Sequence, residues 1–247
     1  MELTFPMRIN KYLAHTGHAT RLGADALIKE GKVLINGRRA ALGDQVQQDD
    51  VVEVKGGAKR TAAHAYFAYH KPRGVITHSP QMDEEDIKSA TGTIPELAGT
   101  FPIGRLDKDS SGLIILTNDG RVTDRMLNPR YEHEKQYVVR TVRPLRTNFK
   151  QYMEIGVDIE GYHTKPCKVQ IMGEKVFRIT LTEGKKHQIR RMVVAMHNEV
   201  RDLERTAIMN VTLGKLKKGA WRKVEGVELS TLLSSLGLQD KGGVKIG

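Results

Sequence analysis

The sequence predicts an α+β protein: a small module of helices and short strands, followed by a larger domain with a mixed, largely antiparallel sheet and flanking helices. Three observations predict it. Helical and strand patterns interleave without a regular strand–helix–strand rhythm. Two pairs of predicted strands are joined by short turns that contain glycine. A glycine-rich basic stretch, GGAKRTAA at residues 56–63, separates two segments of different pattern.

The N-terminal segment contains two amphipathic helices and a hairpin. Residues 8–19 and 21–30 have helical periodicity, with Thr20 as the expected N-cap of the second helix. Asn36-Gly37 is a strong signal for a two-residue hairpin turn, and the VVEV segment that follows predicts a strand. Two helices and a few short strands make a small α/β module.

From residue 64 the chain alternates further strands and helices. The segment AYFAYHKPRGVITHS predicts a strand, a turn and a second strand, and residues 80–100 predict a loop with one short helix. Strands are also predicted in GLIILT, EKQYVVRTV, VFRITLT and ERTAIMNVTLG. Helices are predicted in TNFKQYMEIG, KKHQIRRMVVAMH and ELSTLLSSLGL. The expected divisions are a module at 7–55, a linker at 56–63, a larger domain at 64–237 and a flexible tail at 238–247.

Composition points to a polyanionic partner. The 247 residues carry a formal net charge of +11, and nucleic acid is the commonest polyanion in a cytosol. Aromatic residues make up only 5%, too few for broad stacking platforms. The single Cys167 excludes an internal disulfide and fits a reducing compartment. No apolar run has the length of a membrane span, and residues 1–13 lack a secretory signal, so we expect a cytoplasmic protein without membrane contact.

Residues 104–120, GRLDKDSSGLIILTNDG, place Asp107 and Asp109 in a short turn before an apolar strand. A calcium loop is disfavoured because its twelfth position would be Asn118 instead of glutamate. A phosphotransferase site is disfavoured because the acids precede the strand and follow the cation Arg105. Two interpretations remain open on chemistry alone. One is a carboxylate that attacks a nucleoside whose base has left its stack, and the other is a turn in which Asp107 caps backbone amides.

Four motifs in order extend this segment into a family resemblance. GRLDKDSSGLIILTNDG resembles the signature of RsuA-type pseudouridine synthases, which modify ribosomal RNA. HKPRGVITHS, EHEKQYVVR and LTEGKKHQIRRM resemble three further motifs of that family. The N-terminal module resembles the RNA-binding domain of small-subunit ribosomal protein S-four. FPIGRLDKDS, LERTAIMNVTLG and G-x-WR resemble most the RluF branch, which acts on large-subunit RNA. The resemblance therefore implies the pseudouridine synthase fold, with a mixed, largely antiparallel sheet, flanking helices and a basic cleft.

The resemblance implies a role for each matching residue. Asp107 matches the catalytic aspartate, which attacks a flipped-out uridine at the sugar or the pyrimidine ring. Arg190 matches the arginine that pairs with this aspartate and keeps it ionised. Tyr137 matches the ring that stacks on the uracil, and stacking contributes about 1–3 kcal/mol. Ile189 matches an apolar residue behind the base, and Arg105 one that displaces the base or holds the RNA. The implied reaction needs no cofactor and no metal.

Other basic residues are expected to contact the RNA backbone. Lys185 and Lys186 lie where the best helix should start, an unfavourable position for cations unless an anion binds there. The module departs from its family at TRLGADA, where Leu22 replaces an arginine and weakens its expected affinity for RNA. The full set of expected contacts is Arg8, Lys11, Arg21, Lys32, Arg38, Arg39, Lys71, Arg73, Lys135, Lys185, Lys186 and Arg191.

The resulting hypothesis is an isomerase that converts a uridine of ribosomal RNA, expected in the large subunit, to pseudouridine. Its partners would be ribosomal RNA or an assembly intermediate, with a transfer RNA left open as a second substrate, and we expect a monomer. The alternative is a catalytically silent RNA-binding factor of ribosome assembly, and the presence of Asp107, Tyr137 and Arg190 argues against it.

Overall fold

The computed structural model describes residues 5–16, 18–19, 21–55, 64–77 and 85–238. Two compact units divide the chain, Met1–His64 and Ala65–Gly247, and each is described by itself. The expected cap Thr20, the linker 56–63 and all of the expected tail except Leu238 lie outside the described residues. Within the described part, no helix is long and apolar enough to cross a membrane.

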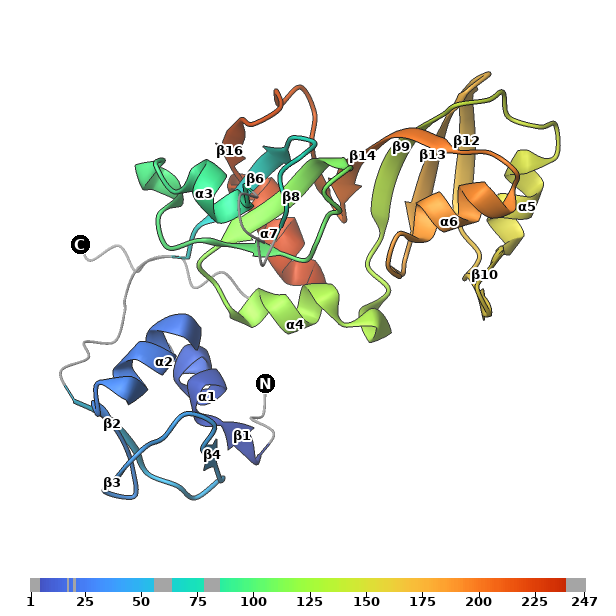
Figure 1. Ribbon diagram of the computed structural model, residues 1–247. Helices are drawn as coiled ribbons and strands as arrows, with labels where there is room; N and C mark the ends of the chain where they lie inside the picture. The colour runs from blue at the N-terminus through green and yellow to red at the C-terminus, as the bar shows by residue number, and fades with distance from the viewer. Residues whose placement is uncertain (1–4, 17, 20, 56–63, 78–84, 239–247) are drawn as a thin grey trace. The chain divides into compact units, whose positions relative to one another are not determined.

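The N-terminal unit packs two helices against short strands (Figure 1). Asn36 and Gly37 have φ values of +50° and +77°, which confirms the predicted hairpin turn. Ile9, Leu13 and Val33 belong to its buried core. The elements are β1 (Met7–Arg8), α1 (Ile9–His15), α2 (Arg21–Lys29), β2 (Val33–Ile35), β3 (Arg38–Arg39), β4 (Gln45–Val46) and β5 (Val52–Val54).

The second unit is built on a nine-stranded sheet of order β12-β13-β9-β14-β8-β6-β16, with β7 and β15 as additional edge partners. Every registered pair is antiparallel except β14 with β8, so the predicted mixed, largely antiparallel sheet is confirmed. The strands are β6 (Tyr66–Lys71), β7 (Phe101–Ile103), β8 (Ser111–Thr117), β9 (Lys135–Thr141), β12 (Lys168–Gly173), β13 (Val176–Leu181), β14 (Val200–Ile208), β15 (Val211–Thr212) and β16 (Trp221–Lys223). A separate hairpin pairs β10 (Asp158–Ile159) with β11 (Tyr162–His163).

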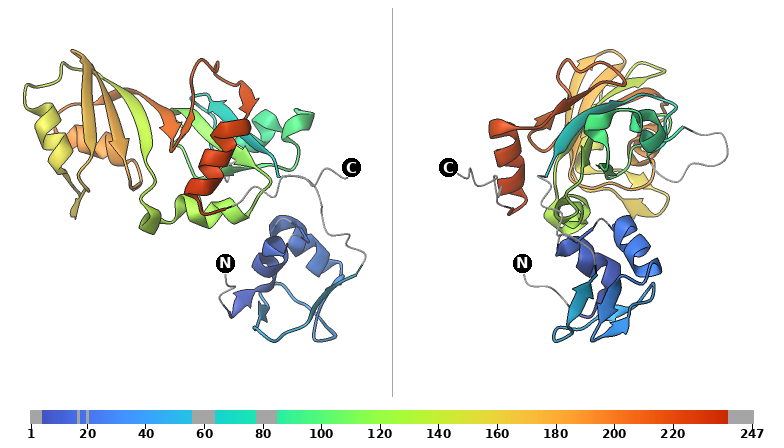
Figure 2. Two further views of the ribbon diagram at one scale, coloured as in Figure 1. Left: turned by 180° about the vertical axis from the view of Figure 1, so that it is seen from behind. Right: turned by 90° about the vertical axis from the view of Figure 1, so that its left-hand side faces the viewer.

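Helices cover the two halves of this sheet differently (Figures 1 and 2). On the β6–β8 half, one face packs against α4 and α7, and the other against α3 and η1. On the β9–β13 half, α5 and α6 form a common core with the strands, in which Phe149 contacts Phe177 edge to face. The helices are α3 (Ile87–Thr91), η1 (Pro95–Leu97), α4 (Arg121–Leu127), η2 (Pro129–Tyr131), α5 (Phe149–Ile155), α6 (Gln188–Ala195) and α7 (Gly226–Ser235).

Several local predictions differ from the structure. The second strand expected after the KPRG turn is wrong for the described residues 75–77, where a single bridge joins Ile76 to Asp86. The best predicted helix begins at Gln188, after both lysines, because His187 adopts a left-handed conformation that ends the preceding loop. The last predicted strand, ERTAIMNVTLG, corresponds in the structure to two strands, β14 and β15, which pair with each other as a hairpin.

Gly112 allows the two halves of the sheet to meet. β14 runs parallel to β8 over two residue pairs, Glu204 with Ser111 and Arg205 with Gly112. Gly112 has φ +117°, and a Cβ atom built on it would lie 2.3 Å from the carbonyl oxygen and 2.4 Å from the nitrogen of Arg205. Any side chain would therefore have to push the two backbones apart.

We expect Gly112→Ala to lower the free energy of unfolding by about 3 kcal/mol or more, because backbone strain and a clash with β14 add together. Urea unfolding of the purified protein measures it. Gly120→Ala is the matched control, because Gly120 is helical in backbone conformation and its Cβ would meet nothing within 4 Å. Equal stability of the two variants would contradict the close approach of β14.

Candidate active site

The turn that carries Asp107 is held through its backbone. It lies between β7 and β8. The buried Leu106 donates its N–H to Thr77 Oγ1 at 3.0 Å, and its carbonyl accepts from the same hydroxyl at 2.8 Å. The N–H of Ser110 donates to the Asp107 carbonyl at 3.0 Å. The Asp107 side chain remains 38% exposed, so a fixed backbone presents a carboxylate that a ligand can reach.

Lys71, the last residue of β6, is a fully buried cation near this turn. Its Nζ donates to the carbonyls of Val75 at 2.6 Å and Pro72 at 3.0 Å. Burial lowers the pKa of Lys71 to about 8, although the carboxylates of Asp107 and Asp109 act in the opposite direction. The expectation that Lys71 contacts the RNA backbone is therefore wrong, because its amine has no solvent-accessible face.

Arg205, on β14, is a second buried cation, with only 4% of the residue exposed. Its Nε donates to the Leu113 carbonyl at 2.7 Å and its Nη1 to the Arg105 carbonyl at 3.3 Å. Its Nη2 is buried and has no hydrogen-bond partner within the described structure. The guanidinium thus joins β14 to β8 and to the residue two positions before Asp107.

A row of paired residues crosses five strands of the sheet at the level of the site. Ile179 pairs with Tyr137, Tyr137 with Arg205, Arg205 with Gly112, and Gly112 with Lys71. Tyr137 is partly buried and packs against the core formed with α5 and α6. The register of the sheet relates this ring to the Asp107 turn.

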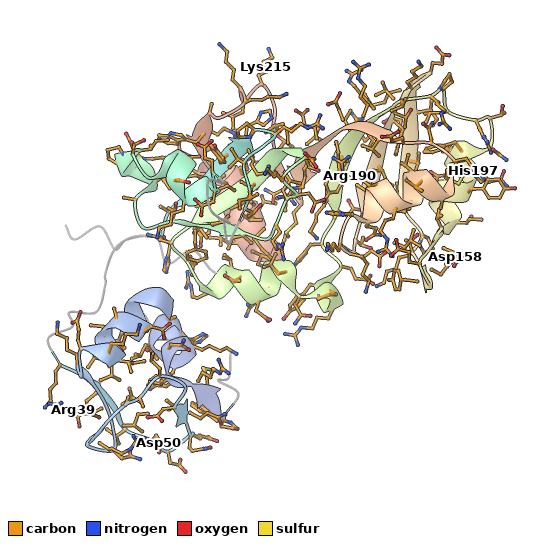
Figure 3. The ribbon with its side chains drawn as sticks, in the orientation of Figure 1. Arg39, Asp50, Asp158, Arg190, His197 and Lys215 are labelled. Atoms are coloured by element: carbon orange, nitrogen blue, oxygen red, sulfur yellow. The ribbon has the colours of Figure 1, made fainter. Side chains whose placement is uncertain are left out.

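The start of α6 contacts the same turn. His187 adopts a left-handed conformation with φ +52°, and its Nε2 lies 3.6 Å from Asp107 Oδ1. Arg190 reaches toward the turn (Figure 3), and its Nη2 donates to the Asp109 carbonyl at 2.9 Å and to Ser110 Oγ at 3.4 Å. Among the described residues, the His187 imidazole lies within 4 Å of the Asp107 carboxylate, whereas Arg190 holds the turn backbone and is not recorded in the predicted ion pair with Asp107.

A buried glutamate orders the loop before α6. Glu183 accepts hydrogen bonds from the Tyr162 hydroxyl at 2.5 Å, from Gln188 Nε2 at 2.6 Å and from the Lys165 N–H at 3.0 Å. The N–H of Lys185 donates to Gln188 Oε1 at 2.8 Å, and its Nζ lies 4.4 Å from the centre of the Tyr162 ring. The position of Lys185 thus has an explanation within the protein and does not require a bound phosphate.

Three predicted contact residues of this unit are exposed beside the turn. Arg105 and Lys186 have exposed side chains. Arg73 is 55% exposed, with its Nε 4.0 Å from Asp109 Oδ1 and its Nη1 3.7 Å from Asp202 Oδ1. These cations are available to a ligand that approaches Asp107.

Other predicted residues are engaged within the protein. Arg191 pairs with Glu160 at 2.8 Å and so ties α6 to the β10–β11 hairpin. Lys135 donates to the His133 carbonyl at 3.0 Å, and burial lowers its pKa. Ile189 is 4% exposed and belongs to the core of the β9–β13 half.

In the N-terminal unit, two of the residues predicted to contact RNA form ion pairs within the protein. Arg38 pairs with Asp44 at 2.8 Å, and Lys32 with Glu30 at 2.7 Å. The side chain of Arg21 lies outside the described structure. The remaining predicted contacts of this unit are exposed: Arg8, Lys11 and Arg39.

Sequence analysis did not single out Gly112, Arg205 or His187. A glycine at the start of a continuous apolar strand is a sign of close backbone approach. Arg205 follows Leu203 at the spacing of one strand face, so a charge stands where an apolar residue is expected. His187 lies inside the segment predicted as a helix, and in the structure it directly precedes the first residue of α6.

Comparison with known proteins places this site in a family. Residues 65–195 match the family model described as RNA pseudouridylate synthase, and residues 7–52 match the S4 domain. The chain belongs to the RNA pseudouridylate synthase family. The protein is accordingly a pseudouridine synthase, an isomerase that acts on RNA, as the resemblance implied.

Individual relatives agree with this assignment. The chain is 41% identical over 229 residues to the dual-specificity RNA pseudouridine synthase RluF of Escherichia coli strain K12, covering 92% of this chain and 78% of that one. It is 35% identical over 235 residues to the ribosomal large subunit pseudouridine synthase B of Bacillus subtilis strain 168, covering 91% and 95%. A solved pseudouridylate synthase structure matches with a TM-score of 0.67 and 28% identity, covering 93% and 99%. The expected family and fold are confirmed.

The buried amine of this pseudouridine synthase predicts a pH dependence of stability. Folding lowers the pKa of Lys71 from 10.5 to about 8. Between these values the unfolded chain binds a proton that the folded chain does not, so the contribution of Lys71 to stability rises with pH.

The free energy of unfolding of the wild type relative to Lys71→Met should therefore increase by up to about 1.4 kcal/mol per pH unit above pH 8. Urea unfolding at pH 7.5, 8.5 and 9.5 measures it. Lys175→Met is the control, since Lys175 is exposed; its difference from the wild type in unfolding free energy should not change with pH. If the difference in unfolding free energy between the wild type and Lys71→Met did not change with pH, the Lys71 amine could not be buried with a lowered pKa.

Proposed function

We propose that this protein isomerises a specific uridine of large-subunit ribosomal RNA to pseudouridine, with Asp107 as the nucleophile. The observation that carries the proposal is the Asp107 carboxylate: it is 38% exposed, lies on a turn held by backbone hydrogen bonds, and has His187 Nε2 at 3.6 Å. The turn thus presents to a ligand the carboxylate that nucleophilic attack requires, with an imidazole beside it.

The reaction balances within one nucleotide. Asp107 attacks the flipped-out uridine, at the sugar or at the ring, and the bond between N1 and C1′ breaks. The uracil turns in place, C5 bonds to C1′, and the proton on C5 leaves while N1 gains one. No oxidant, reductant or external energy is needed. Tyr137, at the level of Arg205 in the sheet, stacks on the base, and Arg190 keeps the turn in place through the Asp109 carbonyl.

The substrate follows from the partners of similar proteins and from charge. The Bacillus subtilis relative is named for the large ribosomal subunit. The S4 domain and the net charge of +11 suit a folded RNA on which phosphate contacts position the enzyme. Such an enzyme acts during ribosome biogenesis in the cytosol and, with the whole site on one chain, as a monomer. It extrudes the target base from its stack to reach it.

We expect Asp107→Asn to lower the rate of pseudouridine formation by roughly a thousandfold or more, because the amide cannot act as the nucleophile. Tritium release from total ribosomal RNA labelled with [5-³H]uridine, taken from a strain lacking the gene, measures the rate. RNA binding by the same variant should be unchanged.

Asp109→Asn is the matched control for this experiment. Asp109 lies on the same turn and is 69% exposed, and its carboxylate lies 4.0 Å from Arg73. This variant should retain most of the activity. If Asp107→Asn were as active as Asp109→Asn, Asp107 would not be the nucleophile.

A further inference from the structure

The loop between β15 and β16 presents a cluster of cations that the site described above does not use. Lys215, Lys217 and Lys218 are exposed, and residues 214–219, here called the lysine loop, contain no acidic residue. Lys215 lies at the outer end of this loop (Figure 3). Within the described ranges, the structure records no ion pair for any of the three, unlike Arg38, Lys165 and Lys168 elsewhere in the chain.

The lysine loop is held by its own turn and by the core. The N–H of Leu216 donates to the Leu213 carbonyl at 3.2 Å, and that of Ala220 to the Lys217 carbonyl at 3.0 Å. The Leu216 side chain packs against the core formed by β6, β8 and α7. The loop backbone therefore loses little further freedom when a ligand binds.

A buried histidine attaches the loop to β6. His70 is 5% exposed, and its Nδ1 donates to the Leu216 carbonyl at 2.8 Å. Its backbone N–H donates to the Ala220 carbonyl at 3.0 Å, and its carbonyl accepts from the Gly219 N–H at 2.8 Å. Three hydrogen bonds thus join this one residue to the lysine loop.

The same end of β6 leads directly to the catalytic turn. Lys71 follows His70, and after the next turn the Gly74 N–H donates to the Lys108 carbonyl at 2.8 Å, one residue from Asp107. The lysine loop and the Asp107 turn are therefore joined to one strand end through short backbone hydrogen bonds. Both lie where the chain leaves the central strands.

The acids near this strand end do not neutralise the lysines. Asp202 lies 3.7 Å from Arg73, and Glu204 lies 3.3 Å from His70 Nε2. An RNA whose target uridine reaches Asp107 continues on both sides as a chain of phosphates. Unpaired, exposed lysines on a fixed loop are the groups that bind such a chain, and each releases counterions when it does.

We propose that the lysine loop binds the phosphate backbone of the RNA substrate next to the target uridine. The proposal rests on the proposed function, of which it specifies the substrate contacts. Lys215, Lys217 and Lys218 carry this contact, and His70 fixes the loop that presents them. The contact is independent of sequence, so it strengthens binding without selecting the nucleotide.

The test is the variant K215Q/K217Q/K218Q of the full chain. Binding to total ribosomal RNA is measured by filter retention at 50–300 mM salt, and the slope of log affinity against log salt should fall by about 2–3 units. At 0.15 M salt, affinity for this RNA should fall about 10- to 100-fold on the same basis. In the tritium-release assay, KM should rise while kcat stays within a factor of about two, since no group at the reacting atoms changes.

The matched control removes the same charge elsewhere. Arg146, Lys150 and Lys175 are exposed and lie, respectively, on the loop before α5, on α5 and in the β12–β13 hairpin; Lys150 Nζ lies 4.0 Å from Glu154 Oε1 in an exposed pair. β12 is the sheet edge opposite β16. The variant R146Q/K150Q/K175Q should change the salt slope by less than about one unit, since these charges face no proposed phosphate.

Equal slopes for the two variants would overturn the proposal, because net charge alone would then explain the loss. An unchanged slope for K215Q/K217Q/K218Q would also overturn it and would assign these lysines to another partner, such as an acidic protein. Failure of the proposed function is a separate result: the wild type would release no tritium, while the binding slopes would still test the loop.

Discussion

The contact between the backbones of Gly112 and Arg205 holds the catalytic unit together. Among the strands that the structure describes, it is the parallel pairing of the sheet, and it joins the half covered by α4 and α7 to the half covered by α5 and α6. Asp107 belongs to the first half, whereas Tyr137, His187 and Arg190 belong to the second. These four side chains can lie near one another only where the two halves approach closely. The absent side chain of Gly112 allows that approach, and the Arg205 guanidinium then fixes it through the Leu113 and Arg105 carbonyls.

This arrangement has an electrostatic consequence for the carboxylate. Two buried cations, Lys71 and Arg205, lie behind the turn, and His187 approaches from its exposed side. A buried cation without a partner is costly, and each of these two donates two hydrogen bonds to backbone carbonyls. The negative charge of Asp107 opposes the loss of the proton from Lys71. The Lys71 amine and the Asp107 carboxylate therefore act on each other, and the stability of this part of the unit depends on both charges.

Local patterns predicted the parts of the structure that depend on local physics. The Asn36-Gly37 turn, the alternating strand β13 and the helix that contains Ile189 and Met192 follow from dihedral preference and periodicity. The motif resemblance added the family, which the comparisons confirm, and a set of site residues that stays a prediction. Features made by contacts distant in the chain were not predictable in this way. The burial of Lys71, the approach of β14 to Gly112 and the contact of His187 with Asp107 depend on strand register and helix placement, which one sequence does not reveal. Arg190, expected to pair with the Asp107 carboxylate, instead donates to the Asp109 carbonyl.

Net charge is a poor guide to where such a protein binds RNA, and the pattern of ion pairs is a better one. Lys165 and Lys168 pair with glutamates, Arg38 with Asp44, and Lys71 is buried, so these charges add to the total without being free to bind a phosphate. A cation that already has a carboxylate partner must exchange one anion for another, and the gain from counterion release is then small. Cations that lie on an ordered backbone with no acid nearby keep the full free-energy gain from counterion release when they bind a phosphate. By this criterion the basic sequence GKLKKG differs from the equally basic NGRR hairpin, where Asp44 neutralises Arg38. Identifying which cations lack an acid partner therefore locates binding surfaces that composition alone cannot.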